Sequence, residues 1–321
     1  MAKHTPVPLP IPELLSDWER HLKAAGKAQS TVISYLQVGL AFLGFLEERG
    51  HSLDVADVRL ADVENYLIEV RERTSAANQA KHFRSLQQFW RWLVDVEGEL
   101  DVSPMATLRP PHVPPKPVPV IPDDVVESLL AVCEKDRARK SARAQSPNRP
   151  NEKQFEARRD AALIRTLFDT GMRVGELVGI EVDDLDWRYD VFHVTGKGDK
   201  QRACPFGDKT ANSLRRYLRA RAQHSFAAKD AFWLGRLGPL TVSGVAQMLE
   251  RRCQQAYVGR LHPHQFRHTF AHIWQLFGGQ EGDLMRLMGW QSREMADRYG
   301  QSAAAVRAQE AHRRLSLGNR L

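Results

Sequence analysis

The sequence predicts a mainly α-helical protein with a small β-sheet, an α+β chain built from two domains. Three observations support this prediction: helical periodicity covers most of residues 11–98, a proline-rich segment follows, and a two-strand pattern interrupts a second helical region near residue 195. A chain of 321 residues is long enough for two cores of ordinary size. We therefore expect domains at residues 8–108 and 123–321, joined by a linker at residues 109–122.

The composition is typical of a globular protein, with 42% hydrophobic and 26% charged residues. The formal net charge of +7 suits a polyanionic partner but does not identify one by itself. Cys133, Cys204 and Cys253 lie far apart without C-x-x-C spacing, which argues against a disulfide framework and a zinc finger. Residues 1–10 contain no apolar signal region and no apolar run reaches membrane-spanning length, so we expect a cytoplasmic chain with no membrane partner.

Four helices are expected in the first domain. The first presents one apolar face, formed by Leu14, Leu15, Trp18 and Leu22. The second begins at a cap on Ser30 or Thr31 and ends at Gly50, and the third covers Leu60–Val70. The fourth ends at Gly98 and carries an apolar stripe formed by Phe83, Leu86, Trp90 and Leu93.

The opposite side of this fourth helix is basic. It carries Lys81, Arg84 and Arg91. Such a row of charges is either a solvated face or a set of contacts to DNA phosphates. These three residues are therefore candidate DNA-binding residues.

The linker is expected between Pro110 and Pro122, where seven of the seventeen prolines lie. Such a run cannot continue a helix and favours an extended polyproline II segment. A helix then begins at Asp123 and continues to about Glu134. The stretch Lys135–Lys153 is basic and poor in apolar residues, so we expect a surface loop that is either a solvated insertion or an electrostatic contact to DNA.

A central helix resumes near Ala157. The segments Phe192–Thr195 and Gln201–Pro205 flank a glycine-containing turn and predict a β-hairpin. Further helices are expected at Lys209–Arg221, Thr241–Tyr257, His264–Phe277, Gly282–Met288 and Ser292–Tyr299, and a separate short helix in the tail at Ala303–Leu317.

Six residues of the second domain suit one chemistry, the transfer of a phosphodiester to a tyrosine. They are Arg173, Lys197, His264, Arg267, Trp290 and Tyr299. A phenol that attacks a phosphodiester needs cationic donors on the non-bridging oxygens, a proton acceptor for itself and a proton donor for the leaving oxygen. This set supplies all of them without a metal, so we expect no metal and no cofactor.

The two arginines and the histidine have distinct reasons to be in this set. Arg173 follows Gly171 at a helix-breaking turn, and Arg267 lies three residues after His264 on one helix face. Guanidinium groups match phosphate oxygens and stay charged at any relevant pH, so both arginines are expected to clamp the scissile phosphate. The imidazole of His264 suits acid–base help near neutral pH.

The histidines of this segment also allow a metal-site interpretation. His264, His268 and His272 recur at four-residue intervals, and His262 lies close by. However, no cysteine or acidic residue lies in the segment, and Arg267 would repel a cation. This arrangement therefore favours phosphate chemistry over metal binding.

Residues 8–316 resemble the tyrosine recombinase (phage integrase) family, because the six residues occur in the family's order and about its separations. There are 24 residues from Arg173 to Lys197, three from His264 to Arg267, and nine from Trp290 to Tyr299. The resemblance implies a helical core-type DNA-binding domain and a catalytic domain that together form a C-shaped DNA clamp.

The resemblance also implies the roles of two residues. Tyr299 is the expected nucleophile, which forms a 3′-phosphotyrosyl bond and releases a 5′-hydroxyl. Lys197, at the tip of the hairpin, is the expected general acid for that 5′-oxygen. Lys200 and Arg202 are its nearby competitors and are also candidate DNA contacts.

The chain departs from the family at several positions. Trp290 stands where most members have histidine; its indole N–H can donate to a phosphate but cannot titrate, and its ring can instead support the helix that carries the nucleophile. Met295-Ala296 and Gln265-Phe266 differ from the pairs common in chromosome-dimer-resolving relatives. These differences favour a mobile-element integrase.

The function implied is that of a site-specific DNA recombinase or integrase, acting in the cytoplasm at the nucleoid. Its partners would be a double-stranded DNA core site and three further copies in a homotetramer, with an accessory directionality factor or a second recombinase left open. The tail, residues 303–321, docks either on a neighbouring protomer or on its own domain. Because the helical pattern begins near residue 11, we expect simple core sites without long accessory arms.

Two other functions stay open at this point. One is a relaxation of supercoils like that of a type IB topoisomerase, which uses the same cleavage chemistry in a monomer. The other is a catalytically silent, recombinase-derived DNA-binding factor.

Overall fold

The structure, a computed structural model, describes residues 10–114, 119–138, 152–196, 201–315 and 318. The chain divides into two compact units, Met1–Lys116 and Pro117–Leu321. The division falls inside the predicted linker at residues 109–122. Each unit has its own hydrophobic core.

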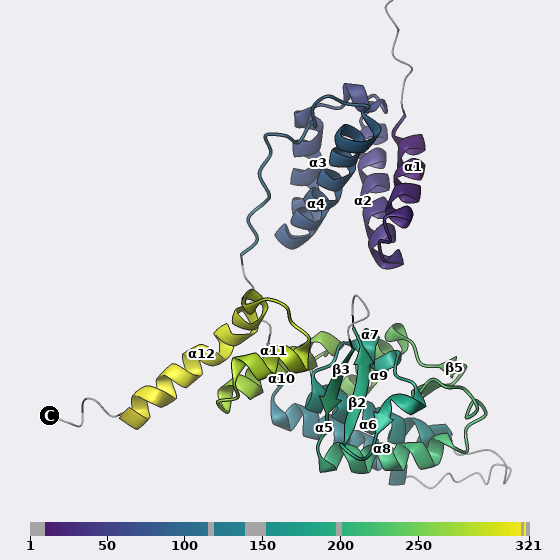
Figure 1. Ribbon diagram of the computed structural model, residues 1–321, viewed down its shortest axis with the longest axis vertical. Helices are drawn as coiled ribbons and strands as arrows, with labels where there is room; N and C mark the ends of the chain where they lie inside the picture. The colour runs from purple at the N-terminus through teal and green to yellow at the C-terminus, as the bar shows by residue number, and fades with distance from the viewer. Residues whose placement is uncertain (1–9, 115–118, 139–151, 197–200, 316–317, 319–321) are drawn as a thin grey trace, which may run out of the picture. The chain divides into compact units, whose positions relative to one another are not determined.

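Unit 1 is a four-helix bundle (Figure 1). Its helices are α1 (Ile11–Ala24), α2 (Gln29–Glu48), α3 (Leu60–Arg73) and α4 (Ala76–Trp92). Each helix buries one apolar face, and large aromatic side chains such as Trp18, Phe42 and Trp90 fill the centre. Ser75 caps α4, because its hydroxyl accepts a hydrogen bond from the backbone N–H of Asn78. After one π turn, Gly98 ends the segment in the left-handed conformation, as predicted.

Two expectations about α2 were wrong. The helix begins at Gln29 without a side-chain cap on Ser30 or Thr31, because the carbonyl of Ala28 accepts the first helical hydrogen bonds. By length and composition alone, α2 is also long and apolar enough to cross a membrane, whereas no apolar run of that length was expected. In this structure its apolar residues are partly used by the bundle: Val32, Val38, Phe42 and Leu46 are buried in the core.

Unit 2 is mainly helical. Its helices are α5 (Asp123–Ala138), α6 (Glu152–Thr170), α7 (Val174–Val178), α8 (Asp208–Arg221), α9 (Val242–Ala256), α10 (Pro263–Leu276), α11 (Glu281–Met288) and α12 (Arg293–Leu315). The helix α6 is central, as predicted, because it packs against α5, α8 and α10 and buries Leu163, Ile164 and Leu167. The short helix α7 was not predicted, since five residues are too few to show a helical period.

A small antiparallel sheet lies against these helices (Figure 1). It contains β1 (Leu185–Asp186), β2 (Val191–Thr195) and β3 (Gln201–Pro205) in that order. The predicted hairpin is confirmed by the pairing of Thr195 with Gln201 and of Val191 with Pro205. Its turn, residues 197–200, lies outside the described residues. The sequence did not predict the two-residue strand β1, nor the pair β4 (Leu234–Gly235) and β5 (Gly238–Pro239).

Three helices of unit 2 differ in extent from the predictions. The helices α5 and α6 extend into the predicted loop Lys135–Lys153, whose residues 139–151 lie outside the described part of the chain. The helix α12 runs unbroken from Arg293 to Leu315, where two separate helices were expected. A single glycine inside a helix costs only about 1 kcal/mol relative to alanine, so Gly300 does not end it.

Candidate active site

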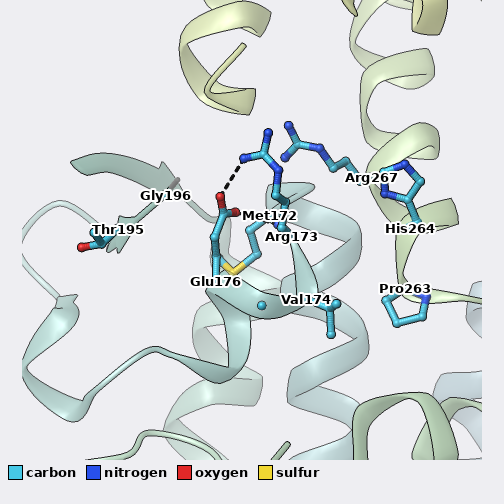
Figure 2. A pocket seen from close by; sticks show the side chains of 10 residues that line it. Met172, Arg173, Val174, Glu176, Thr195, Gly196, Pro263, His264 and Arg267 are labelled. Carbon is cyan, nitrogen blue, oxygen red and sulfur yellow. Dashed lines mark hydrogen bonds and ion pairs between the residues drawn. The ribbon is translucent and has the colours of Figure 1, made fainter. Parts of the chain in front are cut away.

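A pocket of about 480 Å³ opens where α7, β2 and α10 meet (Figure 2). Its described lining brings together Arg173, His264 and Arg267, three of the residues singled out from the sequence. The remaining lining residues are Met172, Val174, Gly175, Glu176, Thr195, Gly196 and Pro263. Residues 197–200 follow Gly196 directly in the chain and lie outside the described residues.

The turn that presents Arg173 depends on Gly171. The helix α6 ends at Thr170, and Gly171 adopts a φ of 58°. A Cβ at this position would lie 2.8 Å from side-chain atoms of Phe270 on α10, so both the conformation and the space require glycine. Arg173 is then the residue before α7, and its side chain is 43% exposed and points into the pocket (Figure 2).

Glu176 holds Arg173 in place. Its carboxylate accepts hydrogen bonds from the backbone N–H of Arg173 (2.7 Å) and from Nη1 of the same residue (2.8 Å). On its other side it accepts two more from the guanidinium of Arg202, at 2.9 and 2.7 Å. Burial by itself raises the pKa of Glu176, but the hydrogen bonds from Arg202 and Arg173 outweigh burial and lower the pKa to about 2. Glu176 is therefore a carboxylate at any relevant pH.

Arg267 is held by the backbone of two other segments. Its side chain is on α10 and the residue is only 1% exposed. Nη1 donates to the carbonyl of Gly171 (2.9 Å) and Nη2 donates to the carbonyl of Met288 at the end of α11. The guanidinium carbon lies 5.5 Å from the centre of the Trp290 ring. These contacts fix the guanidinium at the pocket wall.

Among the described lining residues of the pocket, positive charge exceeds negative charge. Two arginines in the described lining, Arg173 and Arg267, are accompanied by one carboxylate, Glu176, which also binds Arg202. Excess positive charge on pre-positioned donors favours a bound anion, and the planar guanidinium fork suits a phosphate. The pocket can therefore hold a phosphate group and stabilise added negative charge on it.

His264 lies on the exposed side of α10, one turn before Arg267, and borders the same pocket. Its ring centre lies 4.8 Å from that of His268, with the two rings perpendicular. Within the described ranges, no group of three or more histidine, cysteine, aspartate or glutamate side chains is arranged to hold a metal ion. An imidazole at the pocket edge can exchange a proton with a group bound there.

Trp290 lies in a small separate core formed by α10, α11 and α12. The other buried members are Ala271, Leu284, Met288 and Ala296. Trp290 is 7% exposed, with its ring against Arg267 on one side and the first turns of α12 nearby. Of the two roles predicted for Trp290, this burial supports the second, in which the ring holds the helix of the nucleophile.

The remaining predicted residues fall into three groups. Lys197 and Lys200 lie outside the described residues, and Tyr299 lies on α12 but its side chain is not described. Arg202 is bound within the protein: its side chain is 11% exposed and lies against Glu176, which differs from the predicted DNA contact. Lys81, Arg84 and Arg91 lie on the exposed side of α4 in unit 1, which leaves both interpretations of that face open.

Glu176, three residues after Arg173 in the sequence, was not among the predicted site residues. The capping-box pattern could have identified it. In that pattern, a glutamate at the third position of a helix accepts a hydrogen bond from the backbone N–H of the residue that precedes the helix. Its second partner, Arg202, comes from β3 and could not be identified from local sequence.

Comparisons with known proteins agree with this geometry. Residues 120–305 match the model of the phage integrase family, and residues 14–99 match the N-terminal SAM-like domain of phage integrases. Among curated proteins, the chain is 28% identical to the tyrosine recombinase XerC of Chlorobaculum tepidum over 275 residues, 80% of each protein.

Two solved structures show the same fold. The first is the Tn1549 transposon integrase, solved in complex with transposon right end DNA. It has a TM-score of 0.70 and 18% identity to this chain, and the match covers 96% of this chain and 100% of the integrase chain. The XerH site-specific recombinase, solved on its difH substrate after cleavage, has a TM-score of 0.69 and 17% identity over 95% of this chain and 84% of that one.

Proposed function

The chain belongs to the phage integrase family and is a tyrosine site-specific recombinase, and we propose that it cleaves and rejoins DNA through a covalent bond to Tyr299. The observation that carries this proposal is the pocket itself. It places two fixed guanidinium groups, Arg173 and Arg267, beside the titratable His264. This arrangement supplies charge stabilisation and acid–base help for a reacting phosphodiester.

The proposed reaction exchanges one phosphodiester for another. The phenol oxygen of Tyr299 attacks the scissile phosphorus while His264 helps to accept its proton. The bond from phosphorus to the 5′-oxygen breaks, and that oxygen leaves as a hydroxyl with a proton from Lys197. A 3′-phosphotyrosyl bond remains, and attack by the 5′-hydroxyl of another strand reverses the steps. No energy source is needed because the ester bond is conserved.

The two arginines act on the charge that develops in this step. In the transition state the non-bridging oxygens of the phosphate carry more negative charge than in the bound substrate. Arg173 reaches the pocket from the start of α7 and Arg267 from α10, so two different elements contribute to one phosphate site. Trp290 supports this site by packing against Arg267 and the core that anchors α12.

The assembly that we propose is a homotetramer on two paired double-stranded core sites, in the cytoplasm at the nucleoid. The C-terminal half of α12 supports this assembly, because Val306 and Leu315 are 38% and 53% exposed. Such side chains can be covered by another protomer, so the tail at residues 303–321 is the proposed link between subunits. The residues Met295-Ala296 and Gln265-Phe266 favour a mobile element as the source of the DNA sites, and a second recombinase or a directionality factor would then set the direction of exchange.

The test uses suicide substrates, short duplexes from the flanks of the native gene that are nicked near each candidate cleavage position. A protein–DNA adduct that resists denaturant should form with the wild type and without added metal. It should be absent with Tyr299→Phe and present with Tyr257→Phe, a matched control at a fully solvated tyrosine that is 97% exposed.

Three other outcomes would contradict the proposal, and each would support a different assignment. An adduct with Tyr299→Phe would show that another residue is the nucleophile. Tight binding without an adduct on any substrate would support a silent DNA-binding relative. Relaxation of supercoiled plasmid without any intermolecular product would support a topoisomerase-like activity in place of recombination.

A further inference from the structure

We infer that Arg202 is a positioning residue of the phosphate site, which holds Glu176 and the end of α11 and thereby orients both Arg173 and Arg267. The inference rests on the proposed cleavage reaction and deepens it. Arg202 lies on β3, an element that contributes no side chain to the described lining of the pocket. Its effect on the phosphate is therefore transmitted through other residues.

Three nitrogen atoms of Arg202 donate to protein acceptors. Nη1 and Nη2 donate to the two carboxylate oxygens of Glu176, at 2.9 and 2.7 Å, in a bidentate pair. Nε donates to the carbonyl of Leu287 at 2.8 Å. With 11% of its side chain exposed, Arg202 is used inside the fold and does not present its guanidinium to DNA.

The first branch of this network leads to Arg173. Glu176 accepts from Arg202 on one side and from the backbone and side chain of Arg173 on the other. Two cations share the carboxylate, so Glu176 can orient Arg173 without neutralising it fully. If Arg202 were removed, Glu176 would have Arg173 as its one remaining guanidinium partner among the described contacts, and would compete more strongly with the phosphate for it.

The second branch leads to Arg267. The carbonyl of Leu287 binds Arg202, and the carbonyl of the next residue, Met288, accepts from Nη2 of Arg267. The chain then turns at Gly289, with a φ of 62°, directly against the Arg202 side chain: a Cβ at Gly289 would lie 3.4 Å from Cδ of Arg202. Arg202 therefore fixes the end of α11 that in turn holds Arg267.

Only an arginine can make these contacts at once. The guanidinium presents several donors in a rigid plane, which allows a bidentate pair and a third bond in another direction. A lysine would keep the charge near Glu176 but would lose the fork and the bond to Leu287. Arg202→Lys thus separates the geometry of the residue from its charge.

The experiment measures single-turnover cleavage of the suicide substrate by Arg202→Lys and Arg202→Met. On a normal phosphate we expect the rate to fall about 10²-fold, comparable to the loss of one transition-state donor. The Kd for DNA should change by less than about 3-fold, because no phosphate contact is lost. Arg216→Met, which alters a half-exposed arginine on α8, is the matched control and should leave both quantities unchanged.

The decisive arm uses a methylphosphonate at the scissile position, which lacks the charge of one non-bridging oxygen. If Arg202 acts by orienting the arginines on that charge, the ratio of wild-type to variant rates should shrink to within about 3-fold on this substrate. Arg173→Ala, tested alongside, should show the same convergence. A general loss of structure would lower the cleavage rate equally on both substrates.

Three results would overturn the inference. One is a rate ratio of the same size on both substrates. The second is a normal rate at saturating DNA together with a weaker Kd and a salt dependence reduced by about one phosphate contact, which would restore a direct DNA contact. The third is an unchanged rate for Arg202→Lys. If Arg202→Met does not fold, the lysine variant carries the test, and a wild type without any adduct would instead contradict the proposed function.

Discussion

Two clusters of arginines and carboxylates lie in unit 2. They differ in whether the positive charge of the arginines is balanced by carboxylates of the protein. In the first, Asp160 is fully buried and binds Arg159 (2.7 Å), Arg252 (2.8 Å) and the partly exposed Arg251 (3.2 Å), which also lies 3.8 Å from Glu156. Arg252 also binds Asp136, and Arg159 donates to the carbonyl of Leu234. This cluster ties α5, α6 and α9 together.

The second cluster, around Glu176, is open on one side. Glu176 and Arg202 are mostly buried, but the Arg173 side chain is 43% exposed and faces the pocket with Arg267. The closed cluster has three carboxylates (Asp136, Glu156 and Asp160) for its three guanidinium groups. The described part of the open cluster has one carboxylate, Glu176, which binds Arg173 and Arg202, while Arg267 is held by backbone carbonyls. A buried ion pair alone therefore does not mark a functional site, whereas surplus positive charge beside an open pocket does.

The largest expected effect is on the closed cluster. Asp160→Ala would leave Arg159 and Arg252 buried without their shared carboxylate, so we expect a loss of about 3–5 kcal/mol in the free energy of unfolding. Urea denaturation measures it. The exposed pair Arg286–Asp283 provides the control, because Asp283→Ala should cost less than about 1 kcal/mol. A small loss for Asp160→Ala would show that the closed cluster is not structural.

Arg173→Ala should show the reverse pattern. We expect the single-turnover rate of adduct formation to fall about 10²- to 10³-fold, because a donor to the transition-state charge is removed. The free energy of unfolding should change by less than about 1 kcal/mol, since the side chain is 43% exposed. Arg286→Ala, at a side chain that is 84% exposed, should leave both quantities unchanged. Equal losses of rate in Arg173→Ala and Arg286→Ala would show that an arginine at the pocket does not differ in effect from an arginine on the exposed surface.

The pH dependence of stability tests the same carboxylate. The pKa of Glu176 is lowered to about 2 in the folded protein from a reference value of 4.5, so its ionised form stabilises the fold above pH 4.5 and this contribution is lost as the pH falls toward 2. The free energy of unfolding of the wild type should therefore approach that of Glu176→Gln over this range, by up to roughly 3 kcal/mol.

Urea denaturation at a series of pH values gives both curves. Because other carboxylates titrate in the same range, the difference between wild type and Glu176→Gln is the quantity to follow. A flat difference would mean that the arginines do not hold this carboxylate as the contacts indicate.

The two clusters also show what the sequence could and could not predict. Arg173, His264 and Arg267 were predicted to act together, and one pocket does bring them together. Their types and spacings carried the information, because arginines beside a helix-breaking glycine and a histidine have few structural reasons to recur in that order. The predicted hairpin and most helices were found for a similar reason, since their periods are local.

The parts that were missed depend on contacts between distant segments. The bond from Arg202 to Glu176 joins β3 to α7, and the bonds of Arg267 join α10 to Gly171 and Met288. No local period encodes such pairs. The continuity of α12 was also missed: two helices were expected at Ser292–Tyr299 and Ala303–Leu317, but the single glycine between them, Gly300, costs a helix only about 1 kcal/mol relative to alanine.

The smallest expected effect concerns an isolated arginine in unit 1. Arg84 lies on the exposed side of α4, and if it contacts a phosphate it does so as a single charge in water. Arg84→Ala should then weaken the Kd for DNA by less than about 10-fold and reduce the slope of log K against log salt by about 0.9. The cleavage rate at saturating DNA should not change, because Arg84 has no part in the transition state. Arg20→Ala on α1, an exposed arginine paired with Asp17, is the control and should leave the slope unchanged.

An unchanged slope for Arg84→Ala would identify the basic side of α4 as a solvated face. A slower rate at saturation would mean that charge outside the pocket also acts on the reacting phosphate, and that surplus charge beside an open pocket is too narrow a criterion for this enzyme.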